Sequence, residues 1–151
     1  MFSGVFRLGD RRVDALMTPR TELVWIDLED DTRTIIEEIT QSEYSRIPVA
    51  RGDLDYIVGI LDIKELVGVD LYSPDFRLED YLKEPLFIPE NLPALKAFEK
   101  FRSTGIHQAL VIDEYGGVQG MITLYDVLES IVGEIPLEPE DRDYEIVQRD
   151  D

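Results

Sequence analysis

The chain has 151 residues, 44% of them hydrophobic, which is enough for one compact domain or for two small units that share a core. Its 33 acidic and 15 basic residues give a formal charge of −18, and such a field repels phosphate backbones, which argues against nucleic-acid binding. The lack of cysteine excludes disulfides and thiolate metal sites, and the hydropathy pattern predicts neither a transmembrane helix nor a signal peptide, so the chain as given is expected to be soluble.

The first predicted elements are an entering helix, a strand and a second helix. Residues 8–17 have the pattern of a helix that the following Thr-Pro pair stops, because the residue before a proline disfavours helical conformation. The short apolar run "ELVWID" (22–27) predicts a strand that acidic residues end. The segment "DDTRTIIEEITQS" (30–42) predicts a helix with cap candidates at its start and three isoleucines on one face.

A hairpin and a short helix are predicted next. The apolar runs "RIPVA" (46–50) and "YIVGIL" (56–61) are separated by a turn-type loop, which favours an antiparallel pair. The following "DIKELVG" (62–68) predicts a helix with Asp62 as its N-cap and Gly68 as its stop.

A linker with a proline-containing turn (69–84) precedes a second set of elements. "LPALKAFEKFRSTG" (92–105) predicts a helix, "ALVIDEYGGVQGMI" (109–122) a hairpin, and "TLYDVLESIVG" (123–133) a closing helix. The buried positions expected in the first of these helices include Leu95, Phe98 and Phe101.

The second set repeats the first. Residues 23–67, moved by 62 positions, place Ile26 on Ile88 and Val49 on Val111, and one loop deletion places Gly59 on Gly120. A unit of about 50 residues buries too little surface to be stable alone. We therefore expect an α+β fold in which two β-α-β-β-α units pack through their sheets. The predicted divisions are an entering segment (1–20), a first unit (21–68), a linker (69–84), a second unit (85–136) and an acidic tail (137–151).

The motif "GMITLYD" (120–126) is open to two interpretations. Thr123 and Asp126 fit a capping box, in which a hydroxyl and an acidic side chain satisfy the first N–H groups of a helix, and Asp62 with Glu65 fits it too. Alternatively, a helix N-terminus attracts phosphate, and a carboxylate can accept hydrogen bonds from both hydroxyls of a ribose. The residues alone leave both interpretations open.

The tandem arrangement and its closing motifs resemble a CBS-domain pair, also called a Bateman module. The segments "MTPR" (17–20), "YSRIPV" (44–49), "DEYGG" (113–117) and "TLYDVLESIVGEI" (123–135) are similar to the CorC/HlyC group of hemolysin-C-like proteins, relatives of the CNNM magnesium proteins. The resemblance covers roughly residues 8–140. It implies two CBS units related by a pseudo-two-fold axis. It also implies a module at the cytoplasmic face of a membrane, cut from a longer parent whose C-terminal domain begins in the acidic tail.

The resemblance also implies a binding site for an adenosine nucleotide, ATP or AMP, with or without Mg²⁺. Thr123 and Asp126 match the ribose and phosphate element of such sites. In the first copy Asp62 replaces the hydroxyl and would repel a phosphate, while Glu65 is one methylene longer, so one good site per chain is expected.

The remaining site residues implied by the resemblance come from two segments. From residues alone, "YSRIPV" (44–49) is a strand with apolar core positions and a solvated arginine. By resemblance, Arg46 neutralises the phosphate; Tyr44, Ser45, Ile47 and Pro48 border the adenine, and Thr18 and Thr21 contact the base or ribose. No metal site is predicted, and His107 is not expected to be a ligand because it is the single histidine.

The function implied by the resemblance is regulation rather than catalysis. No nucleophile–base–acid set can be assembled, so the chain is not expected to be an enzyme. The resemblance implies a homodimer through its CBS units, including the closing helix, and control of a magnesium- or cobalt-type transporter in the membrane domain of the same parent chain. The alternative is a dimerisation scaffold of that transporter that binds no ligand.

Overall fold

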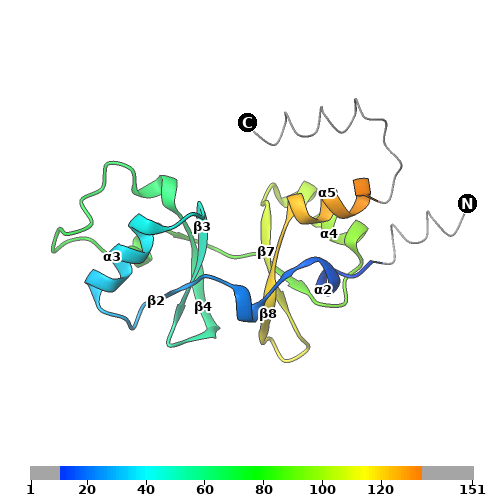
Figure 1. Cartoon of the computed structure of the whole chain (residues 1–151), viewed down its shortest axis with the longest axis horizontal. Helices are drawn as coiled ribbons and strands as arrows, with labels where there is room; N and C mark the ends of the chain where they lie inside the picture. The colour runs from blue at the N-terminus through cyan, green and yellow to red at the C-terminus, as the bar shows by residue number, and fades with distance from the viewer. Residues whose placement is uncertain (1–10, 134–151) are drawn as a thin grey trace, which may run out of the picture.

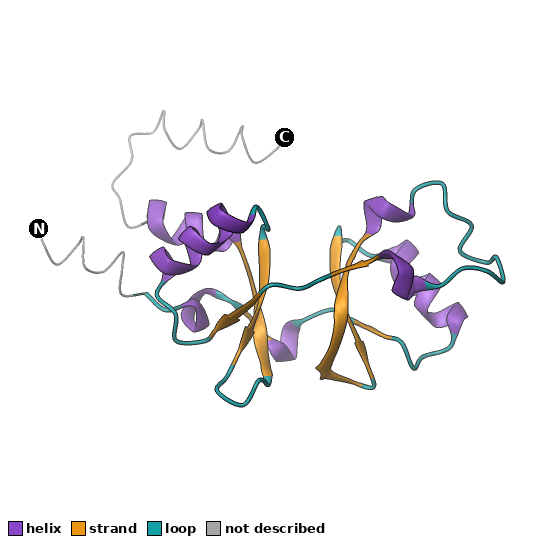
Figure 2. Cartoon of the chain, turned by 180° about the vertical axis from the view of Figure 1, so that it is seen from behind, coloured by secondary structure: helices purple, strands orange, loops and turns teal. Residues whose placement is uncertain are grey.

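The computed structural model describes residues 11–133, and the predictions made for residues 1–10 and 134–151, the acidic tail included, lie outside this range. Two four-stranded sheets stand next to each other, and the helices cover the faces that point away from the neighbouring sheet (Figures 1 and 2). The predicted α+β class with two units packed through their sheets is confirmed. No helix within residues 11–133 is long and apolar enough to cross a membrane.

The sheet of the first unit has the order β2-β3-β4-β5. β3 pairs with β4 as an antiparallel hairpin and with β2 in parallel, which requires the helical crossover that α3 provides. The elements of this unit are β2 (Ile26–Asp27), α3 (Thr32–Gln41), β3 (Arg46–Arg51), β4 (Asp53–Asp62), the 3-10 helices η2 (Ile63–Leu66) and η3 (Leu78–Tyr81), and β5 (Leu82–Lys83).

The sheet of the second unit has the order β1-β8-β7-β6 and the same pairing pattern. Its elements are α2 (Val13–Leu16), β1 (Thr18–Pro19), β6 (Phe87–Pro89), α4 (Ala94–Thr104), β7 (Gln108–Ile112), β8 (Val118–Thr123) and α5 (Leu124–Gly133). The 3-10 helix η1 (Arg20–Glu22) connects β1 to the first unit.

The internal repeat is visible in matching backbone hydrogen bonds. Ile63 N donates to Ser45 O at 2.8 Å in the first unit, and Leu124 N donates to His107 O at 2.8 Å in the second. Ser45 and His107 are the residues that the shift of 62 positions superimposes. The predicted repeat is therefore a repeat of structure as well as of sequence.

Three local predictions are wrong. The strand expected over residues 22–27 is confined to Ile26–Asp27, because Glu22 still belongs to η1. The closing helix of the first unit is only the four-residue 3-10 turn η2, because the chain leaves it at extended Val67 and then turns through Gly68 at φ 82°. Leu95 is 41% exposed, since α4 buries the neighbouring stripe of Ala94, Ala97 and Phe101. Phe98 on the same helix is half-buried, with the Arg102 guanidinium 5.8 Å from its ring centre.

Each sheet is completed by a strand from the chain segment that leads into the other unit. β1 precedes the first unit but pairs with β8, and β5 precedes the second unit but pairs with β4. The equivalent glycines of the two copies allow this close approach: a Cβ on Gly120 would collide with Thr18 O, and one on Gly59 would lie 2.9 Å from Lys83 O. The repeated glycine is thus explained by strand packing.

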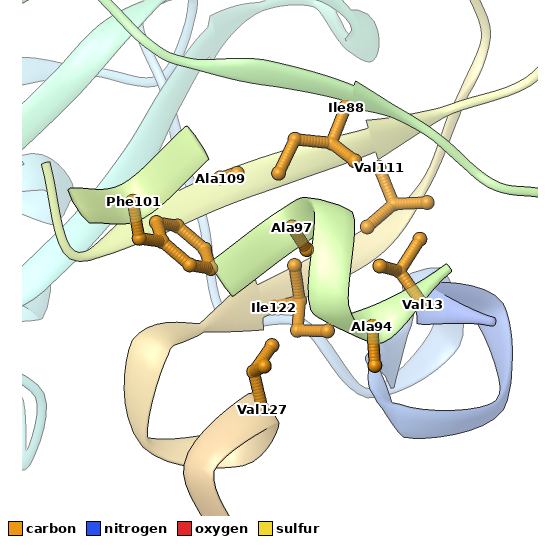
Figure 3. Packing of buried hydrophobic residues seen from close by; sticks show 9 residues of the cluster. All are labelled: Val13, Ile88, Ala94, Ala97, Phe101, Ala109, Val111, Ile122 and Val127. Atoms are coloured by element: carbon orange, nitrogen blue, oxygen red, sulfur yellow. The ribbon is translucent and has the colours of Figure 1, made fainter. Parts of the chain in front are cut away.

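Three apolar clusters hold the fold together. The second-unit core includes Val13 from α2, Phe101 from α4 and Val127 from α5 (Figure 3). A corresponding cluster lies between α3 and the first sheet. The third cluster, centred on Leu54, Ile60, Leu110 and Val118, joins the two sheets, so the pair of units shares a core.

Candidate functional site

The capping box of the second unit is formed. Thr123 N donates to Asp126 Oδ2 at 3.0 Å, and Asp126 N donates to Thr123 Oγ1 at 3.1 Å, which fixes both side chains at the first turn of α5. The predicted capping box is therefore confirmed in the second unit, whereas in the first unit Glu65 pairs with Lys83 instead of closing a box. The formed box leaves ligand-binding capacity, because the Thr123 hydroxyl hydrogen can still donate and the second oxygen of Asp126 can still accept.

The equivalent acidic residues of the first unit are engaged within the protein. Asp62 Oδ1 accepts from Lys64 N at 3.1 Å and its Oδ2 lies 3.6 Å from Arg46 Nε, while Glu65 Oε1 lies 2.9 Å from Lys83 Nζ. Arg46, predicted to neutralise a phosphate, is thus held by an acidic residue at one end of its sheet. An incoming phosphate would compete with Asp62 for it.

Alternation along the strands indicates which faces these side chains share. In β7, Ala109 and Val111 lie in the core beneath α4 and α5, whereas Leu110 lies in the cluster between the sheets. Gln108 shares the face of Leu110 because side chains alternate along a strand. Thr123 is its partner across the β7–β8 ladder and shares that face.

The first unit presents the corresponding pair. In β3 and β4, Ile47 and Leu61 point toward the helices and Ile60 toward the second sheet, so Arg46 and Asp62, which are ladder partners, lie on the face toward the second sheet. We call Arg46, Asp62, Gln108 and Thr123 the polar rung.

The polar rung lies at one end of the paired sheets. Both hairpin turns lie at the other end, where the two units are joined by a hydrogen bond of 2.9 Å from Val118 N to Asp55 Oδ1. Figures 1 and 2 show the two hairpins pointing the same way, with η2 and α5 beginning at the opposite end. The first residues of η2 and of α5 are therefore on the same side of the molecule.

The other predicted site residues occupy different environments. Tyr44 and Ser45 are exposed just before β3, and Pro48 is buried on the face toward the second sheet. Ile47 is 1% exposed in the core beneath α3, so its side chain does not reach the rung and only its backbone could border a ligand.

The two predicted threonines of the entering segment are both exposed. Thr18 is the ladder partner of Met121, two residues before Thr123, and Thr21 lies in η1 between the two units. The structure thus places Thr18 on the strand next to the capping-box strand.

An ion-pair network that the sequence did not indicate links the units at their hairpin end. Arg20 donates to Asp55, to Asp53 and, at 2.9 Å, to Val118 O. The hydrogen bond from Arg20, followed by that from Val118 N, lowers the pKa of Asp55, while the Asp55 hydrogen bond raises the pKa of Arg20. The only sequence signal was the position of Arg20 within "MTPR".

Gln108 was also missed. It is 9% exposed, and its Nε2 has no hydrogen-bond partner among the described residues. Its place could have been noticed because the shift of 62 positions puts Arg46 on it.

A hollow of about 380 Å³ gives access to Asp126 between α2 and α5. It is lined by Arg11, Ala15, Leu16, Asp126, Glu129, Ser130 and Gly133. Within the described part of the chain, no group of three or more His, Asp or Glu side chains could hold a metal ion.

The chain is similar to the CBS domain family over two stretches, residues 13–72 and 78–133. It is 44% identical to the UPF0053 protein sll0260 of Synechocystis over all of its length and 34% of that protein's. It is 35% identical to the magnesium and cobalt efflux protein CorC of Escherichia coli over 95% of its length and 49% of that protein's. The chain therefore spans between a third and a half of the length of these curated relatives.

Two similar solved structures contain nucleotides. A CBS-domain pair with bound AMP from Klebsiella pneumoniae superimposes with a TM-score of 0.75 at 34% identity, covering 81% of this chain and 98% of the other. The CBS domain of a bacterial CNNM/CorC family Mg²⁺ transporter in complex with ATP gives a TM-score of 0.72 at 35% identity, covering 89% and 96%.

Proposed function

The chain belongs to the CBS domain family as a tandem pair, and from its polar rung we propose that it binds an adenosine nucleotide and regulates a membrane transporter for magnesium or a similar cation. The observation that carries the proposal is the intact Thr123–Asp126 box, which lies at the same end of the paired sheets as Arg46. Similar structures hold AMP and ATP, and a similar protein is a magnesium and cobalt efflux protein.

The chemistry of the box suits the sugar and phosphate of a nucleotide. Asp126 is fixed through one oxygen, so the other is positioned to accept from ribose hydroxyls without a further loss of side-chain freedom. The start of α5 adds the partial positive charge of a helix N-terminus. Arg46 can release Asp62 and form a charge-assisted pair with a phosphate.

The net charge of −18 repels the negative charge of a nucleotide, and this repulsion weakens binding. A bound Mg²⁺ would reduce this repulsion by neutralising part of a polyphosphate, so we propose that ATP binds as its magnesium complex while AMP can bind without the ion. The metal would be carried by the nucleotide rather than by a protein cluster.

The regulatory step follows from the position of the rung between two units. A ligand that contacts Arg46 of the first unit and Thr123 of the second favours whichever arrangement of the units allows both contacts. We propose that this change reaches the membrane domain of the parent chain through the entering segment, at the cytoplasmic face, and that two copies act as a homodimer through the helical faces, α5 included. In this scheme the chain binds without catalysing a reaction.

The alternative is a dimerisation scaffold of the same transporter without a ligand. It is favoured by one observation, namely that the side chains of Thr123 and Asp126 each accept a hydrogen bond from the other residue's backbone N–H without any ligand. Under this alternative the box is a helix cap only.

Calorimetric titration of AMP and ATP, with and without Mg²⁺, separates the two. We expect saturable binding to the wild-type chain and a roughly 10- to 100-fold weaker affinity in Asp126→Ala, the range that loss of a hydrogen bond to a charged group implies. Asp31→Ala is the matched control, since it removes the side-chain cap of α3, a 3.2 Å bond to Thr34 N, and the same charge far from the rung. A folded dimer that binds neither nucleotide would establish the scaffold.

A further inference from the structure

The side chain of Gln108 is buried at the start of β7, and its amide nitrogen has no hydrogen-bond partner among residues 11–133. The residue is 9% exposed. Buried polar groups are nearly always hydrogen-bonded, because an unpaired donor loses its bonds to water and gains nothing in return. An unpaired amide nitrogen at this position is expected to lower the stability of the unliganded chain, and an apolar side chain of similar size is expected to pack there at lower cost.

The neighbours of Gln108 indicate what could satisfy it. Across the ladder is Thr123, whose hydroxyl can donate, and the facing sheet presents Arg46, which can only donate. The one carboxylate of the rung, Asp62, is already bonded to Lys64 N and paired with Arg46. A set of donors gathered at one end of two sheets fits a ligand group made of acceptors, and phosphate is such a group.

We propose that Gln108 is a ligand-contacting residue: its amide nitrogen, enclosed in the unliganded chain, turns toward the ligand and donates its N–H to a phosphate oxygen of the bound nucleotide. This inference rests on the proposed function and adds to it a residue from the second unit. Gln108 occupies the place that Arg46 has in the first unit, so the two units approach the phosphate with equivalent positions, one charged and one neutral. The amide supplies a hydrogen bond with no counter-ion to displace, whereas Arg46 must first leave Asp62.

The test compares two effects of the same substitution, one on thermal stability and one on nucleotide affinity, which are expected to go in opposite directions. Gln108→Leu removes the unpaired amide, so the unliganded variant is expected to melt at a higher temperature than wild type. The same variant is expected to bind AMP and ATP about 5- to 20-fold more weakly, because the phosphate loses a donor. Gln108→Glu places an acceptor against the phosphate and is expected to bind more weakly still.

The matched control is Gln119→Leu on the neighbouring strand. Gln119 Nε2 donates to Asp113 Oδ2 at 3.0 Å at the hairpin end, so its loss is expected to lower the melting temperature and to leave nucleotide affinity unchanged. A merely structural Gln108 would change stability alone.

The outcomes separate the two proposals. If wild type binds nucleotide and Gln108→Leu binds it equally well, the inference is wrong and the proposed function stands. If wild type binds no nucleotide, the proposed function fails and the inference with it. Weaker binding by a more stable Gln108→Leu, with Gln119→Leu unaffected in affinity, supports both.

Discussion

Substitution of Gly120 by alanine tests whether the repeated glycine exists to admit the exchanged strand. The added Cβ would collide with Thr18 O and would lie 2.7 Å from Met17 Sδ and 3.1 Å from its Cγ. The methionine side chain can rotate away, but a carbonyl oxygen moves only with its strand, so β1 must shift. Overpacking of this kind costs about 1–3 kcal/mol. At about 2 kcal/mol, a chain of this size would melt about 4–8 °C lower.

Thermal unfolding followed by circular dichroism measures the effect. Gly133→Ala is the control, because a Cβ at that position, the last residue of α5, meets no atom within 4 Å and its backbone is not at positive φ. It is expected to be neutral or slightly stabilising, since alanine is the better helix former. A Gly120→Ala variant as stable as Gly133→Ala would refute the steric role of the glycine.

Three further perturbations follow from the packing and the charges. Phe101→Ala, at a position 1% exposed, is expected to cost about 3–5 kcal/mol in denaturant unfolding, and a loss below about 1 kcal/mol would contradict the described core. The lowered pKa of Asp55 means that its stabilisation is complete above the ordinary carboxyl value and is lost as the pH falls toward the lowered pKa. The stability difference between wild type and Asp55→Asn should therefore shrink in acid, and a constant difference would contradict the Arg20 contact. Burial, followed by the charges of nearby acidic residues, raises the pKa of Glu38. Glu38→Gln should thus melt higher than wild type at neutral pH and lose this advantage below the ordinary carboxyl value.

The architecture could be predicted because its determinants are local and repeated. The isoleucine stripe and Asp31 specify α3, and Gly105, at φ 74°, ends α4 where the sequence has a glycine after a helical pattern. The repeat then predicts that two incomplete units share a core, since each buries too little surface alone.

What the sequence did not indicate depends on long-range contacts. The exchange of β1 and β5 between the sheets leaves only a glycine in each motif as its signal, and a glycine at such a place can equally mark a turn, a bulge or a helix end. The face of α4 that is buried, and with it the exposure of Leu95, is set by the neighbours that surround the helix and not by its own periodicity. Gln108 was missed because a glutamine in a strand becomes conspicuous only once its burial is known.

For the candidate site, the sequence predicted the hydrogen bonds of the capping box but not the ion pair between Arg46 and Asp62. The reciprocal bonds of Thr123 and Asp126 follow from a four-residue pattern. The pairing of Arg46 with Asp62 required the register of β3 against β4, which no local pattern specifies.

The exchanged strand also determines the path that a mechanical load would take. The first described residues of the chain belong to the second unit, because Val13 lies in its core and β1 is an edge strand of its sheet. A pull on the chain ahead of α2 would therefore be borne first by β8 and α5, and would reach the first unit only through η1 and the contact between the sheets. The first described residues of the chain are thus attached to the unit that carries the Thr123–Asp126 box, although that unit is the more distant one in sequence.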